Sequence, residues 1–194
     1  FHRQLNDGAG PHNLIVDRRG IVWYSGNLRG YIGRYDPKSD KIDKIRMPAR
    51  NGGDPHTLVF DRGQKNIWIT AQHGNAIGRL NLRTRDVKLV NVTSRSSRPY
   101  GIIVAPSGIV WSALFGTNKL ASVDPETLRL TEYALPSGAR PRRLGATGDG
   151  NIYYVDYRRG RLGRLDPKTK GVLAHMVTPG MEWTVVAAAT LQPR

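Results

Sequence analysis

Four short pairs of residues along the chain begin with proline and continue with a side chain that can donate hydrogen bonds. The second members of these pairs are His12, His56, Tyr100 and Arg142. If the fold brings them together, they form an arc of donors suited to an oxygen-rich or anionic ligand. Whether they can act together depends on the elements that carry them.

The elements around these pairs are repeats. An aromatic anchor follows each pair at intervals of roughly 40–45 residues, and the anchors are Trp23, Trp68, Trp111 and Tyr153. Each anchor is followed by a short segment that ends in a turn, for example Ile32-Gly33-Arg34-Tyr35-Asp36-Pro37. Self-similarity at such a period indicates one supersecondary unit stacked several times. We expect the four anchors to occupy equivalent, mostly buried positions.

Each repeat contains four short runs rich in Ile, Val, Leu, Tyr and Trp, which are typical of half-buried strands. In the first repeat the runs lie at about residues 13–17, 21–25, 31–35 and 42–46, and in the third at about 101–105, 109–113, 119–123 and 129–135. Turn residues such as Arg19-Gly20 separate the runs, and no window shows a helical period. Four strands per repeat predict an all-β fold of β-propeller blades. Helical repeat families are excluded because they need helices, and WD40 repeats because the chain lacks their Gly-His and Trp-Asp pair.

The repeat boundaries predict a lead-in at residues 1–10, four blades at about 11–54, 55–98, 99–140 and 141–177, and an irregular tail at 178–194. The tail does not start a fifth repeat, because residues 179–183 lack the order of turn, strand, turn and Trp that begins the other repeats. The chain also opens at Phe1, without an initiator methionine or a signal peptide. We therefore expect a fragment whose blades form an open arc of a larger ring, with edges that invite self-association.

The composition limits the function classes without choosing one. A net charge of +15 over 194 residues is either a generally basic surface or a footprint for an anionic partner. Basic residues cluster only at 140–143 and 158–161, and the aromatic residues fall at strand positions, so a dedicated nucleic-acid role is disfavoured. The chain has no apolar run long enough to span a membrane. The absence of cysteine excludes disulfides and thiolate metal sites but fits a periplasmic or secreted protein as well as a cytoplasmic one.

Several segments together resemble the repeated sequence pattern of the blades in the virginiamycin B lyase (streptogramin lyase) family. The resemblance extends from residue 11 to about 177. The segments are Pro55-His56-Thr57-Leu58-Val59-Phe60, Gly74-Asn75-Ala76-Ile77-Gly78-Arg79-Leu80, Gly108-Ile109-Val110-Trp111 and Thr131-Glu132-Tyr133-Ala134-Leu135-Pro136. The resemblance implies a seven-bladed propeller, of which about three blades would lie outside this chain. It also implies an enzyme that opens the lactone ring of a cyclic depsipeptide antibiotic by elimination rather than hydrolysis.

The chemistry implied by the resemblance needs a base and a Lewis acid. A magnesium ion polarises the carbonyl and a histidine removes the α-proton, because an α-proton next to an ester is a weak acid. A hard cation of this kind prefers carboxylate oxygens. Magnesium is therefore the cofactor that we expect for a lyase of this family.

The resemblance assigns roles to residues of this sequence. His12 and His56 match the catalytic histidines, with His56 as the base, and Asp54 and Gln72 match the metal ligands. Asp54 is one methylene shorter than the glutamate of the family, and Gln72 replaces a second glutamate. We expect weak magnesium binding in consequence. Tyr100 and Arg142 are expected to bind the ligand.

Two alternatives remain open at this stage. The chain can be a non-catalytic propeller that presents a binding face of a larger protein, for which the periplasm is one compartment. In that case the histidines hydrogen-bond to neighbouring backbone, and Asp54 caps the turn of residues 52–55. A metal-dependent lactonase ranks last, because it needs several acidic ligands near the propeller axis.

Overall fold

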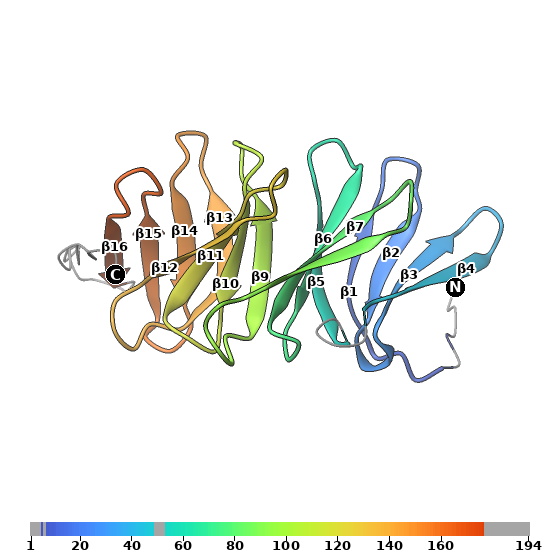
Figure 1. Cartoon of the computed structure of the whole chain (residues 1–194), viewed down its shortest axis with the longest axis horizontal. Coiled ribbons are helices and arrows are strands. Elements are labelled where there is room, and N and C mark those ends of the chain that lie inside the picture. Colours follow the sequence, from blue (N-terminus) through green and yellow to red (C-terminus); the bar gives the residue numbers. More distant parts are fainter. Residues whose placement is uncertain (1–4, 6, 49–52, 177–194) are drawn as a thin grey trace. The chain divides into compact units, whose positions relative to one another are not determined.

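The computed structural model describes residues 5, 7–48 and 53–176. Sixteen strands and one short 3-10 turn are found in this part of the chain, and no α-helix (Figure 1). The strands form four antiparallel sheets of four strands each. In every sheet the strands pair in sequence order, so that each sheet is a simple meander. This arrangement confirms the predicted all-β blades of four strands.

The first two sheets belong to one compact unit, residues 1–91, which we call unit 1. The first sheet contains β1 (Pro11–Val16), β2 (Val22–Gly26), β3 (Tyr31–Asp36) and β4 (Lys41–Arg46), with the turn η1 (Asn27–Arg29) after β2. The second contains β5 (Pro55–Phe60), β6 (Asn66–Ala71), β7 (Ala76–Asn81) and β8 (Val87–Asn91).

The other two sheets belong to unit 2, residues 92–194. The third sheet contains β9 (Pro99–Val104), β10 (Val110–Leu114), β11 (Lys119–Val123) and β12 (Leu130–Ala134). The fourth contains β13 (Pro141–Ala146), β14 (Ile152–Asp156), β15 (Arg161–Leu165) and β16 (Val172–Met176). The strands predicted from the sequence differ from these bounds by one or two residues. The predicted tail, 178–194, lies outside the described residues, and the open arc stays a prediction.

Each unit has its own hydrophobic core. In unit 1 the core contains Ile21, Trp23, Ile32, Ile45, Met47, Leu58, Ile67, Ile69 and Leu80. In unit 2 it contains Ala105, Trp111, Ala113, Leu120, Leu135, Ala139, Ile152, Tyr154, Leu165 and Val172. Both sets combine residues of two sheets, because a sheet with one apolar face must cover it with a neighbour. None of the helical segments in the described part of the chain has the length and apolar character needed to cross a membrane.

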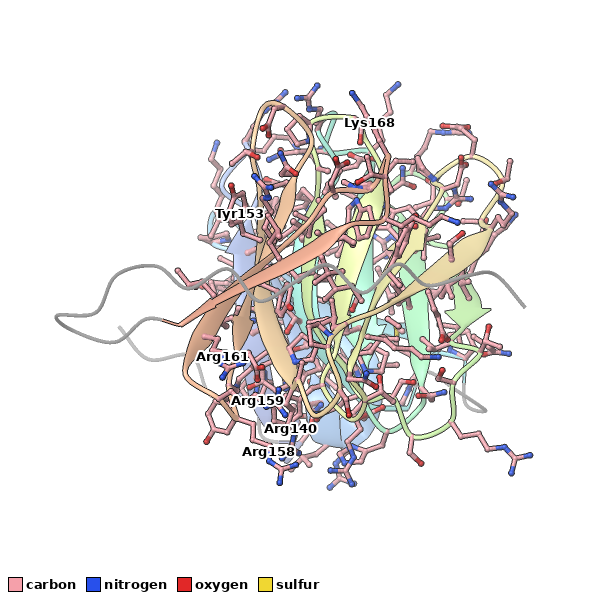
Figure 2. All side chains as sticks on the ribbon, turned by 90° about the vertical axis from the view of Figure 1, so that its left-hand side faces the viewer. Arg140, Tyr153, Arg158, Arg159, Arg161 and Lys168 are labelled. Carbon is pink, nitrogen blue, oxygen red and sulfur yellow. The ribbon has the colours of Figure 1, made fainter. Side chains whose placement is uncertain are left out.

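The expected burial of the aromatic anchors is confirmed for three and wrong for one. Trp23, Trp68 and Trp111 are between 1% and 3% exposed, whereas Tyr153 is 38% exposed (Figure 2). The cross-strand neighbour of Tyr153 on β13 is Gly145, which offers no side chain to pack against. The buried aromatic residue of this blade is Tyr154, and β14 alternates between buried and exposed positions.

The first strand of every sheet contains the same irregularity. The registers of β1, β5, β9 and β13 against their neighbours all shift between the proline and the third residue after it. In each case two residues of the first strand lie opposite one residue of the second strand, which is a β-bulge. The prolines therefore begin the first strand of each sheet. The bulge holds the residue after each proline, which is where the four predicted donors lie.

Candidate functional site

The two histidines predicted for the site meet in unit 1. The rings of His12 and His56 have their centroids 3.7 Å apart and an interplanar angle of 34°. His12 is exposed, while His56 is only 4% exposed. Each ring follows the proline of its own bulge, so the pairing depends on the packing of β1 against β5. The result is one accessible imidazole resting on one buried imidazole.

Hydrogen bonds between the two sheets hold the backbone that carries the buried ring, and a neighbour on the same strand contacts the ring itself. Ser25 Oγ, opposite the bulge of β1, donates to the carbonyl oxygen of His56 over 3.0 Å. Asn13 Oδ1 accepts the backbone N–H of Leu58 over 2.8 Å. Nδ1 of His56 lies 2.9 Å from Thr57 Oγ1. Because an imidazole nitrogen can accept or donate a proton, this pair is a suitable acid–base group.

The corresponding residues of unit 2 form a different kind of pair. Arg142 Nη2 donates to the hydroxyl oxygen of Tyr100 over 3.0 Å. This hydrogen bond raises the pKa of the Arg142 guanidinium above its usual value. The guanidinium carbon lies 5.0 Å from the ring centroid of Tyr100 and 4.8 Å from that of Tyr157. Unit 2 therefore presents a permanent cation, held between aromatic rings, where unit 1 presents imidazoles.

The sequence profile of the virginiamycin B lyase family matches residues 2–188. The chain belongs to the virginiamycin B lyase family. A virginiamycin B lyase of Nocardia farcinica is 24% identical over 159 residues, which are 82% of this chain and 52% of that protein. The chain thus spans about half the length of the curated relative that it matches.

Solved structures of virginiamycin B lyases have the same fold. A catalytically inactive variant from Staphylococcus aureus, crystallised with quinupristin, matches with a TM-score of 0.81 at 20% identity, over 92% of this chain and 59% of that one. A selenomethionine form from the same organism matches with a TM-score of 0.76 at 19% identity, over 94% and 71%. These likenesses establish the β-propeller fold of the chain.

The residues that the family resemblance suggests for magnesium do not fit a metal site in this structure. Asp54 Oδ2 accepts the backbone N–H of His73 over 2.6 Å and lies 2.8 Å from Nδ1 of the same residue. Asp54 Oδ1 accepts the N–H of Gly74 over 3.0 Å. The carboxylate thus holds the turn between β6 and β7. Among the described residues, no three His, Asp or Glu side chains are grouped so that they could bind a metal ion.

A second set of equivalent positions was missed by the sequence analysis. Each of the four prolines pairs with a residue on the second strand of its sheet. The residues that directly follow these partners are Asn27, Gln72, Phe115 and Tyr157. Gln72 was predicted as a metal ligand, whereas the other three positions were not singled out. The signal was available, since all four residues lie four places after an aromatic anchor.

These positions change how the aromatic residues of unit 2 are interpreted. Phe115 lies 5.4 Å from Tyr100 and 5.9 Å from Tyr157 between ring centroids, and Tyr157 is 59% exposed. Tyr157 follows the end of β14 and so lies outside the strand positions expected for the aromatic residues. Arginines and aromatic rings are interleaved at this end of unit 2.

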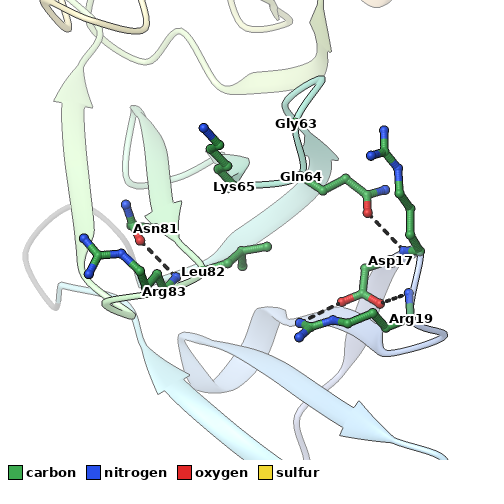
Figure 3. A pocket seen from close by; sticks show the side chains of 9 residues that line it. Asp17, Arg19, Gly63, Gln64, Lys65, Asn81, Leu82 and Arg83 are labelled. Atoms are coloured by element: carbon green, nitrogen blue, oxygen red, sulfur yellow. Dashed lines mark hydrogen bonds and ion pairs between the residues drawn. The ribbon is translucent and has the colours of Figure 1, made fainter.

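An open pocket of about 740 Å³ lies at the other end of β1 (Figure 3). Its lining includes Asp17, Arg18, Arg19, Gln64 and Lys65. Asp17 follows the end of β1, so the pocket is about 16 Å along the strand from His12. The Arg18 N–H donates to Gln64 Oε1 over 3.0 Å and so joins the turns of two sheets. We regard this pocket as separate from the histidine pair.

Proposed function

We propose that this chain is part of a carbon–oxygen lyase that opens the lactone of a cyclic depsipeptide by elimination. The observation that carries the proposal is the contact between the rings of His12 and His56, centred 3.7 Å apart, in a chain of the virginiamycin B lyase family. A catalytically inactive variant of one such lyase was crystallised with quinupristin. We extend that ligand class to this chain as a hypothesis.

The proposed reaction transfers one proton and breaks one bond. An imidazole of the pair takes the α-proton of the residue whose β-oxygen carries the ester. The electron pair of that C–H bond forms a Cα=Cβ double bond, the Cβ–O bond breaks, and the ester carboxylate leaves. The proton then passes from the imidazole to water, so no co-reactant is required.

The residues of the chain divide this work. His12 is the imidazole exposed to a ligand, and His56 is the buried ring positioned by Ser25 and Thr57. Tyr100 and Arg142, in unit 2, remain the predicted ligand-binding residues, and the proposed proton transfer does not depend on them. Because Asp54 already holds a turn, the proposal assigns no step to a metal ion.

The test is incubation of the purified chain with quinupristin, followed by liquid chromatography and tandem mass spectrometry, which separate the opened isomer from the cyclic substrate. Elimination gives an opened product with the mass of the substrate, while hydrolysis adds the mass of one water. His12→Ala and His56→Ala should each abolish the opened product. His73→Gln is the matched control, because His73 is an exposed histidine of the same unit, and it should retain activity. A hydrolysed product, or full activity of both alanine variants, would refute the proposal.

The second candidate is a binding propeller without catalysis. It is favoured by one observation, that the carboxylate expected to bind metal is engaged in a turn and its expected partner is the uncharged Gln72. Calorimetry on the same samples separates the two candidates. Saturable binding of quinupristin with no opened product over a long incubation supports the binding propeller.

A further inference from the structure

A cationic pocket in unit 2 stands apart from the proposed lyase chemistry. It has a volume of about 280 Å³, and its lining includes Phe115, Thr117, Gly138, Arg140 and Arg158. The volume is just below the usual range for pockets that hold drug-sized ligands, so the space suits a small group. Figure 2 shows Arg140, Arg158 and Arg159 together at one end of the last sheet, with Lys168 at the opposite end.

Arg140 is held rigidly at the wall of this pocket. Its Nε donates to the carbonyl oxygen of Phe115 over 3.2 Å, and its guanidinium carbon lies 4.1 Å from the centroid of the Phe115 ring. Its backbone N–H donates to Asp156 Oδ1 over 3.0 Å. These contacts use Nε and the flat face of the guanidinium. The two terminal amino groups have no acceptor among the described residues, and they are the edge that recognises oxyanions.

Two further arginines reach the pocket from the turn between β14 and β15. Arg158 contributes to the lining, and Arg159 lies over Gly138. Gly138 has a φ of +76°, and a Cβ atom there would lie 2.6 Å from Arg159 Nη2. A glycine at this position therefore admits the arginine close to the pocket. Both arginine side chains are exposed, so they can adjust to a ligand.

The charge of this cluster is not balanced within the described part of the protein. Arg140, Arg158 and Arg159 take part in none of the ion pairs found among the described residues. The nearby carboxylate of Asp156 is only 5% exposed and already accepts the Arg140 N–H. Three like charges around one concave site repel each other until an anion joins them.

We propose that this pocket binds a tetrahedral oxyanion, the phosphate or sulfate group of a small ligand. The forked N–H donors of arginine match two oxygens of such a group at once. Arg140 supplies a fixed fork, while Arg158 and Arg159 close over the anion from the turn. The site uses neither His12 nor His56, and it does not depend on the proposed lyase activity.

The test is a titration of the ¹⁵N-labelled chain with inorganic phosphate and, separately, sodium sulfate, at ionic strength held constant with sodium chloride. We expect saturable shifts of the amide signals of Gly116 and Gly138. Arg140→Gln and Arg158→Gln should each weaken binding about tenfold, since each removes a charge-assisted contact. Lys168→Gln removes the same charge at the other end of the sheet and should bind as the parent does.

Two further measurements identify the preferred anion and test whether the arginine fork is needed. The tighter of phosphate and sulfate identifies the natural group. Arg140→Lys keeps the charge but loses the fork, so it should also bind more weakly. Equal weakening in Lys168→Gln, equal shifts with chloride alone, or unchanged binding by Arg140→Lys would overturn the proposal. If Arg140→Gln lowers the melting temperature, Arg158→Gln decides the result, because Arg158 lies in an exposed turn.

Discussion

Units 1 and 2 carry the same bulge at the same places in their first strands but present different side chains there. In unit 1 the residue after the proline is histidine in both sheets, and the two rings meet. In unit 2 it is Tyr100 in one sheet and Arg142 in the other, joined by a hydrogen bond. Both units have the same backbone irregularity at this place. The bulge therefore determines where a side chain lies, while the residue type determines its chemistry.

The position four residues after each aromatic anchor shows the same division. Unit 1 has the amides Asn27 and Gln72 there, and Asn27 Nδ2 donates to the carbonyl oxygen of Pro55 over 3.1 Å. Unit 2 has Phe115 and Tyr157, which lie against arginines. Unit 1 is thus suited to proton transfer, and unit 2 to holding anionic or oxygen-rich groups. The two halves of a repeated fold have acquired different chemistry.

The largest expected effect separates chemistry from binding. His12→Ala or His56→Ala should lower kcat for lactone opening by about 100- to 10,000-fold, the usual contribution of an acid–base group. Arg142→Gln should instead leave kcat nearly unchanged, because the predicted role of Arg142 is ligand binding and not proton transfer. Steady-state kinetics with quinupristin measures both effects. A drop in kcat for Arg142→Gln as large as that of the histidine variants would erase the distinction between the units.

The aromatic anchors should differ in their contribution to stability. Trp68→Ala in unit 1 should lower the free energy of unfolding by about 3–5 kcal/mol, because it empties a buried site. Tyr153→Ala in unit 2 should cost less than about 1 kcal/mol, because Tyr153 is exposed and faces Gly145. Urea denaturation followed by circular dichroism gives both values. Equal losses would show that Tyr153 is buried in solution by a partner.

Adding a carboxylate should affect metal binding in one unit only. Gln72→Glu places a charged oxygen next to the turn that Asp54 holds, and magnesium should then raise the melting temperature by about 1–3 °C. Magnesium should have a weaker effect on the parent chain. Tyr157→Glu, at the equivalent place in unit 2, should show no magnesium effect, because its neighbours are arginines. A magnesium shift in the parent equal to that of Gln72→Glu would show that the parent already has a metal site.

The smallest effect concerns the turn after the first strand of unit 1. Burial raises the pKa of Asp17, but the N–H groups of Ile21 and Arg19 and the Trp23 indole together lower it below its usual value. Because the folded pKa is depressed, its stabilisation is present above the unfolded value of about 3.9 and is lost as pH falls through the folded value. Asp17→Asn should therefore cost about 1 kcal/mol at neutral pH and progressively less in acid.

The equivalent residue in the first sheet of unit 2 is Ala105, which follows β9 as Asp17 follows β1 and cannot titrate. Ala105→Gly should change stability by a pH-independent amount. Melting temperatures of both variants between neutral and acidic pH make the measurement. A loss for Asp17→Asn that does not shrink in acid would contradict the role of the carboxylate charge.

Much of the fold could be predicted from local signals. Arg19-Gly20 and Asp124-Pro125 are turns because of their own backbone preferences, and the strands between such turns were located within one or two residues. Burial was harder to predict. Tyr153 has the spacing of the three tryptophans, but its exposure depends on the missing side chain of Gly145, its neighbour on another strand.

By itself, the sequence determined that the chain is built of four-stranded blades and that a hydrogen-bonding residue follows each proline, because periodicity and turn chemistry are properties of neighbouring residues. Only the tertiary structure decided that His12 rests on His56, that Asp54 holds the turn at His73 and Gly74, and that Arg140 lies on Phe115. The first of these contacts joins two strands, the other two join segments next to strands, and those two depend on the directions of single side chains. Such contacts arise from packing within and between sheets, which the spacing of residues in the sequence does not encode.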